Sequence, residues 1–88
     1  MNIEEKRCCV YAIQSETTGR VYVGQTDLLQ RRLGEHNKGR VISTKGEVPW
    51  KLVAREYFED QSDARWTERS VKKSKGTRVR WLAKNTIG

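Results

Sequence analysis

Glu68 is an acidic residue at a position where a predicted helix requires an apolar one. The helix is expected over residues 62–73, and Glu68 shares one face of it with Ala64, Thr67 and Val71. A carboxylate on such a face is costly unless it is paired or bound to a cation. Two interpretations stay open: a ligand for a hard cation such as Mg²⁺, or a salt bridge to a neighbouring base. The neighbouring bases are Arg65, Arg69 and Lys72.

Arg32 and His36 form a second feature, because they lie four residues apart in a helix predicted over residues 28–38. That spacing places the two side chains side by side on one helix face. Together they could act on a phosphate group. Alternatively, both could be solvated side chains of a basic helix, and the spacing alone does not decide between the two.

Tyr11 and Tyr22 stand one on each of two predicted strands, residues 8–14 and 21–24, which the turn-rich residues 15–20 join into a hairpin. Strand alternation sets Cys9, Tyr11 and Ile13 on one face of the hairpin, with Val10, Ala12 and Gln14 on the other. Taken alone, the two tyrosines are ordinary packed or cross-strand aromatics.

In combination, these residues resemble the GIY-YIG nuclease family. Val10-Tyr11 is followed, after ten intervening residues, by Tyr22-Val23-Gly24, which is similar to the paired tripeptides that name the family. Arg32 lies eight residues past Gly24, as the family's helix arginine does, and His36 falls where some members carry a histidine. The resemblance covers about residues 8–75. Two departures are the first tripeptide, which reads Cys9-Val10-Tyr11, and Gln25, where some members carry lysine.

The resemblance implies a metal-dependent endonuclease that hydrolyses DNA phosphodiester bonds with Mg²⁺ or Mn²⁺. Glu68 matches the family's metal-binding glutamate, which makes it the expected metal ligand. Arg32 would neutralise charge that develops on the phosphorane. Tyr22 would be the general base for the attacking water, with help from nearby cations.

The resemblance also implies roles for residues around this centre. Tyr11 and His36 would position water and phosphate, or His36 could share the proton transfer. Gly24 would let the backbone turn tightly beside Tyr22. Some family members carry a late asparagine near the site, and Asn85 is the candidate here, although it lies farther from Glu68 than expected.

The elements that must position these residues run β-β-α-β-α-α. The third strand is expected over residues 50–58, and a short third helix over residues 77–84 with Val79, Leu82 and Ala83 facing inward. The expected helix signals are Asp27 and Ser62 as N-caps, Gly39 as the stop of the first helix, and Gly76 as the break after the second. This order predicts an α+β fold with a small three-stranded antiparallel sheet flanked by helices.

The charge of the chain favours a polyanionic partner. Eighteen Lys and Arg against eleven Asp and Glu give a formal net charge of +7 on 88 residues. Nucleic acid is the first candidate for such a balance and an acidic membrane surface the second. Six exposed bases are the expected nucleic-acid contacts, namely Lys38, Arg40, Lys45, Arg69, Lys72 and Lys73.

Length and composition predict one domain over residues 1–88 in a reduced, cytoplasmic setting. No apolar run approaches the length of a membrane span, residues 1–6 are too charged to begin a signal peptide, and the adjacent Cys8 and Cys9 are poorly placed for a disulfide. Other functions stay open: a catalytically silent nucleic-acid-binding module, a partner-binding domain, or a nuclease directed to RNA. Without a separate recognition domain, a protein partner or a homodimer could supply specificity.

Overall fold

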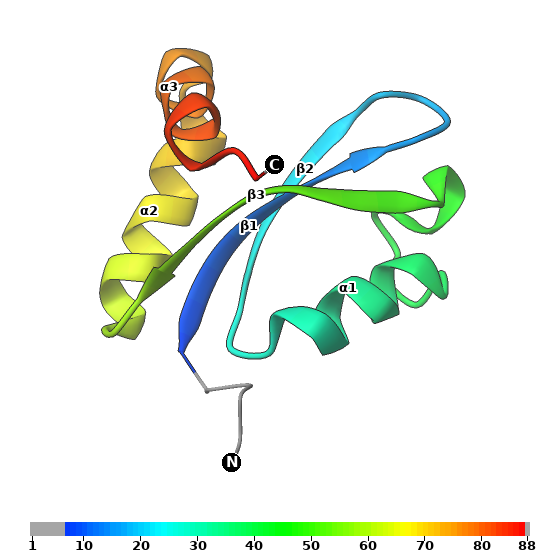
Figure 1. Cartoon of the computed structure of the whole chain (residues 1–88), viewed down its shortest axis with the longest axis horizontal. Coiled ribbons are helices and arrows are strands. Elements are labelled where there is room, and N and C mark those ends of the chain that lie inside the picture. The colour runs from blue at the N-terminus through cyan, green and yellow to red at the C-terminus, as the bar shows by residue number, and fades with distance from the viewer. Residues whose placement is uncertain (1–6, 88) are drawn as a thin grey trace.

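The computed structural model describes residues 7–87, so the charged segment of residues 1–6 lies outside the described part (Figure 1). The strands are β1 (Cys8–Ser15), β2 (Val21–Thr26) and β3 (Trp50–Phe58), and the helices are α1 (Leu29–Asn37), α2 (Gln61–Lys73) and α3 (Lys75–Asn85). The sheet order is β2-β1-β3 with both pairings antiparallel. The predicted α+β fold and its element order are therefore confirmed. Within residues 7–87, no helix combines the length and apolar character needed to cross a membrane.

The central strand β1 supplies apolar side chains to both faces of the sheet. Cys9, Tyr11 and Ile13 pack with residues of α1 and β3 on one face. Val10 and Ala12 pack on the other face, against α2 and α3. The predicted alternation is confirmed, and Figure 1 shows the result: α1 covers one side of the sheet, while α2 and α3 cover the other.

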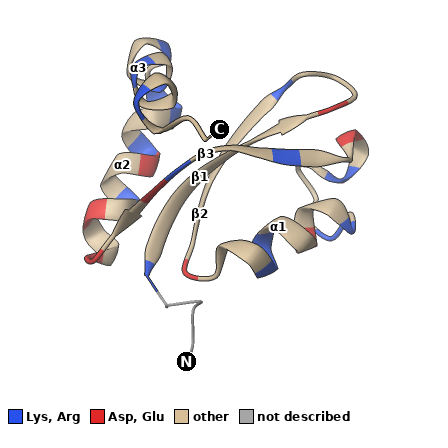
Figure 2. Ribbon diagram, in the orientation of Figure 1, with Lys and Arg blue, Asp and Glu red and all other residues tan. Residues whose placement is uncertain are grey.

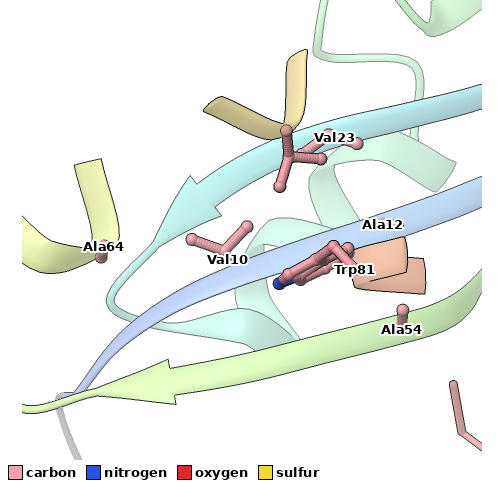
Figure 3. Packing of buried hydrophobic residues seen from close by; sticks show 7 residues of the cluster. Val10, Ala12, Val23, Ala54, Ala64 and Trp81 are labelled. Carbon is pink, nitrogen blue, oxygen red and sulfur yellow. The ribbon is translucent and has the colours of Figure 1, made fainter. Parts of the chain in front are cut away.

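The face covered by α2 and α3 is built from small and β-branched residues around one large indole. Figure 3 shows Val10, Ala12 and Val23 of the hairpin facing Ala64 of α2 and Trp81 of α3. Trp81 is buried, and its Nε1–H donates to Glu56 Oε1 of β3 at 2.8 Å. Because an indole carries both a large apolar area and a donor, this contact fixes which side of α3 faces the sheet.

The inward face and the start of α3 differ from the prediction. Val79 is 56% exposed and Ala83 is also exposed, whereas Trp81 faces the core and Leu82 packs beside it. Gly76 was predicted to end the second helix, but it lies inside the first turn of α3. Ser74 separates the two helices, and its hydroxyl accepts from the Thr77 N–H.

The other helix starts also differ from the predicted caps. Asp27 does not cap α1: Leu28 is the N-cap residue, and its N–H donates to Thr26 Oγ1 instead. Asp60, rather than Ser62, caps α2 by accepting from the Ser62 N–H. Gly39 follows the C-cap of α1 with a φ of +74°, a conformation that favours glycine, so the predicted stop is confirmed.

Candidate active site

Tyr11 reaches across the neighbouring strand at Gly24, its partner in the β1–β2 register. A Cβ atom built on Gly24 would lie 2.5 Å from the Tyr11 hydroxyl oxygen and 2.7 Å from Cζ. No side chain fits there, so glycine is required by close packing. The expected tight turn beside Tyr22 is wrong, because Gly24 lies inside β2 and its φ is not positive.

His36 of α1 holds the Tyr11 hydroxyl from below the surface. Its side chain is completely buried, with Nε2 2.8 Å from the Tyr11 hydroxyl and Nδ1 2.8 Å from Thr44 Oγ1. The Thr44 hydroxyl donates to the Val41 carbonyl, so Thr44 Oγ1 accepts from Nδ1–H. Nε2 is then an acceptor, and Tyr11 donates to it. His36 is fully buried, so solvent does not reach its ring, and Nε2 contacts the Tyr11 hydroxyl.

The pKa shifts of His36 and Tyr11 agree with a neutral His36 ring that accepts a hydrogen bond from a protonated Tyr11. Burial is the main cause that lowers the pKa of His36, and the nearby Arg32 guanidinium lowers it further, which favours the neutral ring. Burial likewise raises the pKa of Tyr11 to about 12, although its interaction with Arg32 opposes the shift. The charges of Tyr22 and Glu68 also act on this hydroxyl. Tyr11 therefore keeps its proton at neutral pH.

Arg32 places a fixed positive charge in the lining of a cleft. Its Nη1 donates to Glu35 Oε1 at 2.9 Å, which raises the pKa of Arg32 and lowers that of Glu35. The Arg32 side chain is 37% exposed. It lines a cleft of about 570 Å³ together with Cys8, Gln25, Thr26, Asp27, Arg31, Glu35, Gln61 and Arg65. The cleft thus has walls from the hairpin, α1 and α2.

Tyr22 is half-buried on the edge strand β2 and joins the two sides of the sheet. Its ring lies 5.2 Å from the His36 ring, centroid to centroid, on the α1 side. From α2, Lys72 Nζ lies 5.7 Å from the Tyr22 ring centroid. The same Nζ atom is 2.8 Å from Glu68 Oε2. Lys72 of α2 therefore contacts Tyr22 at the edge strand β2, while its ion pair links it to Glu68.

Glu68 has one engaged oxygen and one available oxygen. Of the salt bridges considered from sequence, the structure contains the one to Lys72, while the Glu68 side chain stays 21% exposed. Among residues 7–87, Oε1 has no protein partner, and no three His, Cys, Asp or Glu side chains cluster as a metal site. A single carboxylate fits Mg²⁺, which takes few protein ligands and completes its shell with water and phosphate oxygens.

Asn85 lies away from these residues. Its side-chain amide donates to the Trp81 carbonyl of its own helix, and the following residue, Thr86, bridges Ala54 of β3. That places Asn85 beside β3, at the sheet edge opposite β2. The six bases expected to contact nucleic acid are all exposed, and they lie on α2 and around the end of α1 (Figure 2).

Three residues of the site were not predicted from the sequence. Glu35 orients Arg32, and its position three residues further along the helix was a usable signal. Arg65 lines the cleft with Arg32 and belongs to the basic stretch of α2. Thr44 fixes the His36 ring but lies in a loop without periodicity, so no sequence pattern pointed to it.

Comparison with known proteins adds an independent finding. The family model described as the GIY-YIG catalytic domain matches residues 7–80. UPF0213 proteins of Bacillus cereus (strain ZK / E33L), Bacillus thuringiensis subsp. konkukian (strain 97-27) and Bacillus anthracis are each 31% identical over 67 residues. Each match covers 75% of this chain and 69% of the relative.

Proposed function

Because this chain belongs to the GIY-YIG catalytic domain family, a family of nucleases, we propose that it is a metal-dependent endonuclease that hydrolyses DNA phosphodiester bonds. The observation that supports the proposal most is the connection of three elements at the edge of β2. Lys72 joins Glu68 to the ring of Tyr22, and His36 contacts the rings of both Tyr22 and Tyr11.

The side chains present are suited to attack of water on a phosphodiester. Arg32 would bind a non-bridging phosphate oxygen and stabilise the charge that builds on it during attack. Tyr22, in its phenolate form, would accept a proton from the attacking water and become the neutral hydroxyl. Tyr11, whose proton points at His36, presents its oxygen lone pairs outward to orient that water. His36 and Thr44 keep the Tyr11 hydroxyl in place without touching the substrate.

Glu68 is the residue that would hold the divalent cation, through the oxygen that Lys72 leaves available. When bound, Mg²⁺ or Mn²⁺ supplies Lewis-acid stabilisation of phosphate charge. The ion pair with Lys72 is no obstacle, because a partly exposed pair of this kind contributes under about 1 kcal/mol and is easily exchanged.

Glu68→Gln tests the proposal, because it keeps the size of the side chain and removes the charge. Cleavage of DNA with Mg²⁺ or Mn²⁺ should fall by roughly 10³ or more, about 4 kcal/mol of transition-state stabilisation. DNA binding without metal should persist or strengthen, since a negative charge leaves a basic surface. Glu59→Gln, at an exposed acid outside the site, is the matched control and should cleave normally.

The outcomes separate the alternatives that the sequence left open. Normal turnover by Glu68→Gln with a lowered melting temperature would reduce Glu68 to a salt-bridge residue. Cleavage of RNA but not DNA would redirect the activity. Binding of DNA without cleavage by the unaltered protein, with any of several divalent metals, would identify a silent binding module.

A further inference from the structure

Trp66 on α2 is an exposed indole that the fold does not use. It is 70% exposed, whereas Trp50 and Trp81 are 3% and 8% exposed. Those two buried indoles each donate their Nε1–H, to the Thr44 carbonyl and to Glu56. Among residues 7–87, Trp66 belongs to neither hydrophobic cluster and its N–H has no protein acceptor. Folding therefore gives no reason for a tryptophan at this position.

Two arginines flank Trp66 in a shallow hollow. The hollow has a volume of about 170 Å³ and is lined by Ser62, Arg65, Trp66 and Arg69. Their spacing of three or four residues places them on one stripe of α2. Within the described part of the chain, neither arginine is in an ion pair with an acid. An exposed aromatic face between two unpaired guanidinium groups is suited to a flat, negatively charged partner.

The hollow adjoins the cleft that Arg32 lines, and Arg65 is the residue they share. This side chain lines both the Trp66 hollow and the larger cleft that contains Arg32. Glu68 points to the sheet side of α2, and Trp66 lies about 200° further around the helix, given about 100° per residue. A chain that leaves the cleft over Arg65 therefore meets the indole next.

We propose that Trp66 is a stacking platform for an unpaired nucleobase, with Arg65 and Arg69 contacting the adjacent phosphates. The substrate would then contain a single-stranded DNA segment beside the cleavage site. Stacking on an aromatic side chain requires a base whose face is free, and duplex bases have theirs covered by neighbouring pairs. The two arginines favour DNA over a protein segment, because they supply charge that phosphates match.

The test measures binding in the absence of metal, so it does not depend on cleavage. Three DNA ligands of equal length are compared by fluorescence anisotropy: a single strand, the same strand with abasic positions, and a blunt duplex. The wild type should bind the intact single strand more tightly than the abasic one. Trp66→Leu should weaken intact single-strand binding by roughly tenfold to a hundredfold and abolish the difference from the abasic strand. Duplex affinity should not change.

Two controls isolate the indole. Val79→Ala removes an exposed apolar side chain from α3 and should leave all three affinities unchanged. Trp66→Phe keeps an aromatic face and should retain part of the preference for the intact strand. Melting temperatures of all variants should match the wild type, since neither side chain is in the core.

The stacking proposal is wrong if Trp66→Leu leaves single-strand binding unchanged, a result that would point to a protein contact instead. It is also wrong if Trp66→Leu weakens binding of the intact and the abasic strand equally. The inference rests on the proposed action on DNA, but the two fail separately. A protein that prefers intact single strands through Trp66 yet never cleaves would retain the platform and lose the nuclease. A protein that cleaves, with Trp66→Leu binding every ligand normally, would do the reverse.

Discussion

Residues of the hairpin, α1 and α2 all contact the hydroxyl of Tyr11 or act on it through their charges. Gly24 leaves space for the ring, His36 Nε2 accepts the hydrogen bond of the hydroxyl, and the charges of Arg32 and Glu68 act on the oxygen. A hydroxyl with a pKa of about 12 does not take a proton from water at neutral pH. In the proposed mechanism, proton transfer is therefore assigned to Tyr22 and not to Tyr11.

Replacement of Tyr22 by phenylalanine should separate catalysis from packing. Tyr22→Phe keeps the ring between His36 and Lys72 and removes only the hydroxyl. Loss of a general base should slow cleavage by roughly 10²–10⁴, with little change in melting temperature. Tyr57→Phe, on the exposed part of β3, is the control and should cleave normally. Near-normal cleavage by Tyr22→Phe would make that tyrosine a packing residue.

His36 should make the stability of the fold depend on pH. Burial and Arg32 lower its pKa in the folded protein, so the unfolded chain binds the extra proton first, below about pH 6.5. The full free energy of unfolding is therefore present above about pH 6.5 and falls as pH decreases towards the folded-state pKa. Urea denaturation between about pH 7.5 and 5.5 would measure the slope.

The matched variant for that measurement is His36→Gln, which removes the one histidine of the chain. Its stability should be lower than that of the wild type at about pH 7.5, because the contact with Tyr11 is altered, and should change less across the same range. A wild-type stability that is constant between about pH 6.5 and 5.5 would contradict the prediction.

At the scale of the elements, Ser74 serves two helices at once. Its N–H donates to the Ser70 carbonyl at the end of α2, and its hydroxyl accepts from the Thr77 N–H at the start of α3. Ser74→Ala should therefore lower the free energy of unfolding by about 0.5–2 kcal/mol in chemical denaturation. Ser74→Asp retains an acceptor and should stay close to the wild type. Equal stability of the alanine variant would show that the cap is dispensable.

Element types were predictable from the sequence, but helix starts were not. Apolar runs flanked by turn residues identified the strands, and Gly39 marked the end of α1 correctly. Near the start of α2, both Asp60 and Ser62 carry a side-chain oxygen that could act as a cap. Which of them does so depends on local backbone angles, and these follow from how the helix packs on the sheet. Sequence patterns do not record that choice.

For the candidate site, too, the sequence predicted which element carries each residue but not how the side chains pack. Spacing correctly placed Arg32 and His36 on the same helix, but it did not reveal that His36 would be fully buried. The burial depends on Thr44, which a loop brings to Nδ1 from outside the helix. The side of α3 that faces inward was missed for a related reason. Trp81 finds Glu56 only once β3 is beside it.

At the scale of the whole molecule, positive charge lies on helices on both sides of the sheet (Figure 2). With a net charge of +7, DNA affinity should be mostly electrostatic and weaken steeply with salt. With about six phosphate contacts, the dissociation constant should rise by roughly 10³ between about 50 and 200 mM salt. Titration of labelled DNA at several salt concentrations would show this. A flat response would mean that the basic surface is not the DNA contact.

The central position of β1 has a consequence for the motions of the molecule. Neither hydrophobic cluster can open without exposing this strand, because its side chains are shared between both. In hydrogen–deuterium exchange, its amides should be the slowest to exchange, through global unfolding alone, while those of α1 and α3 exchange through local opening. Exchange of the Tyr11 amide as fast as that of Arg32 would contradict this. If β1 is the slowest to exchange, the site combines a tyrosine on the most persistent strand with an arginine on a helix that opens more readily.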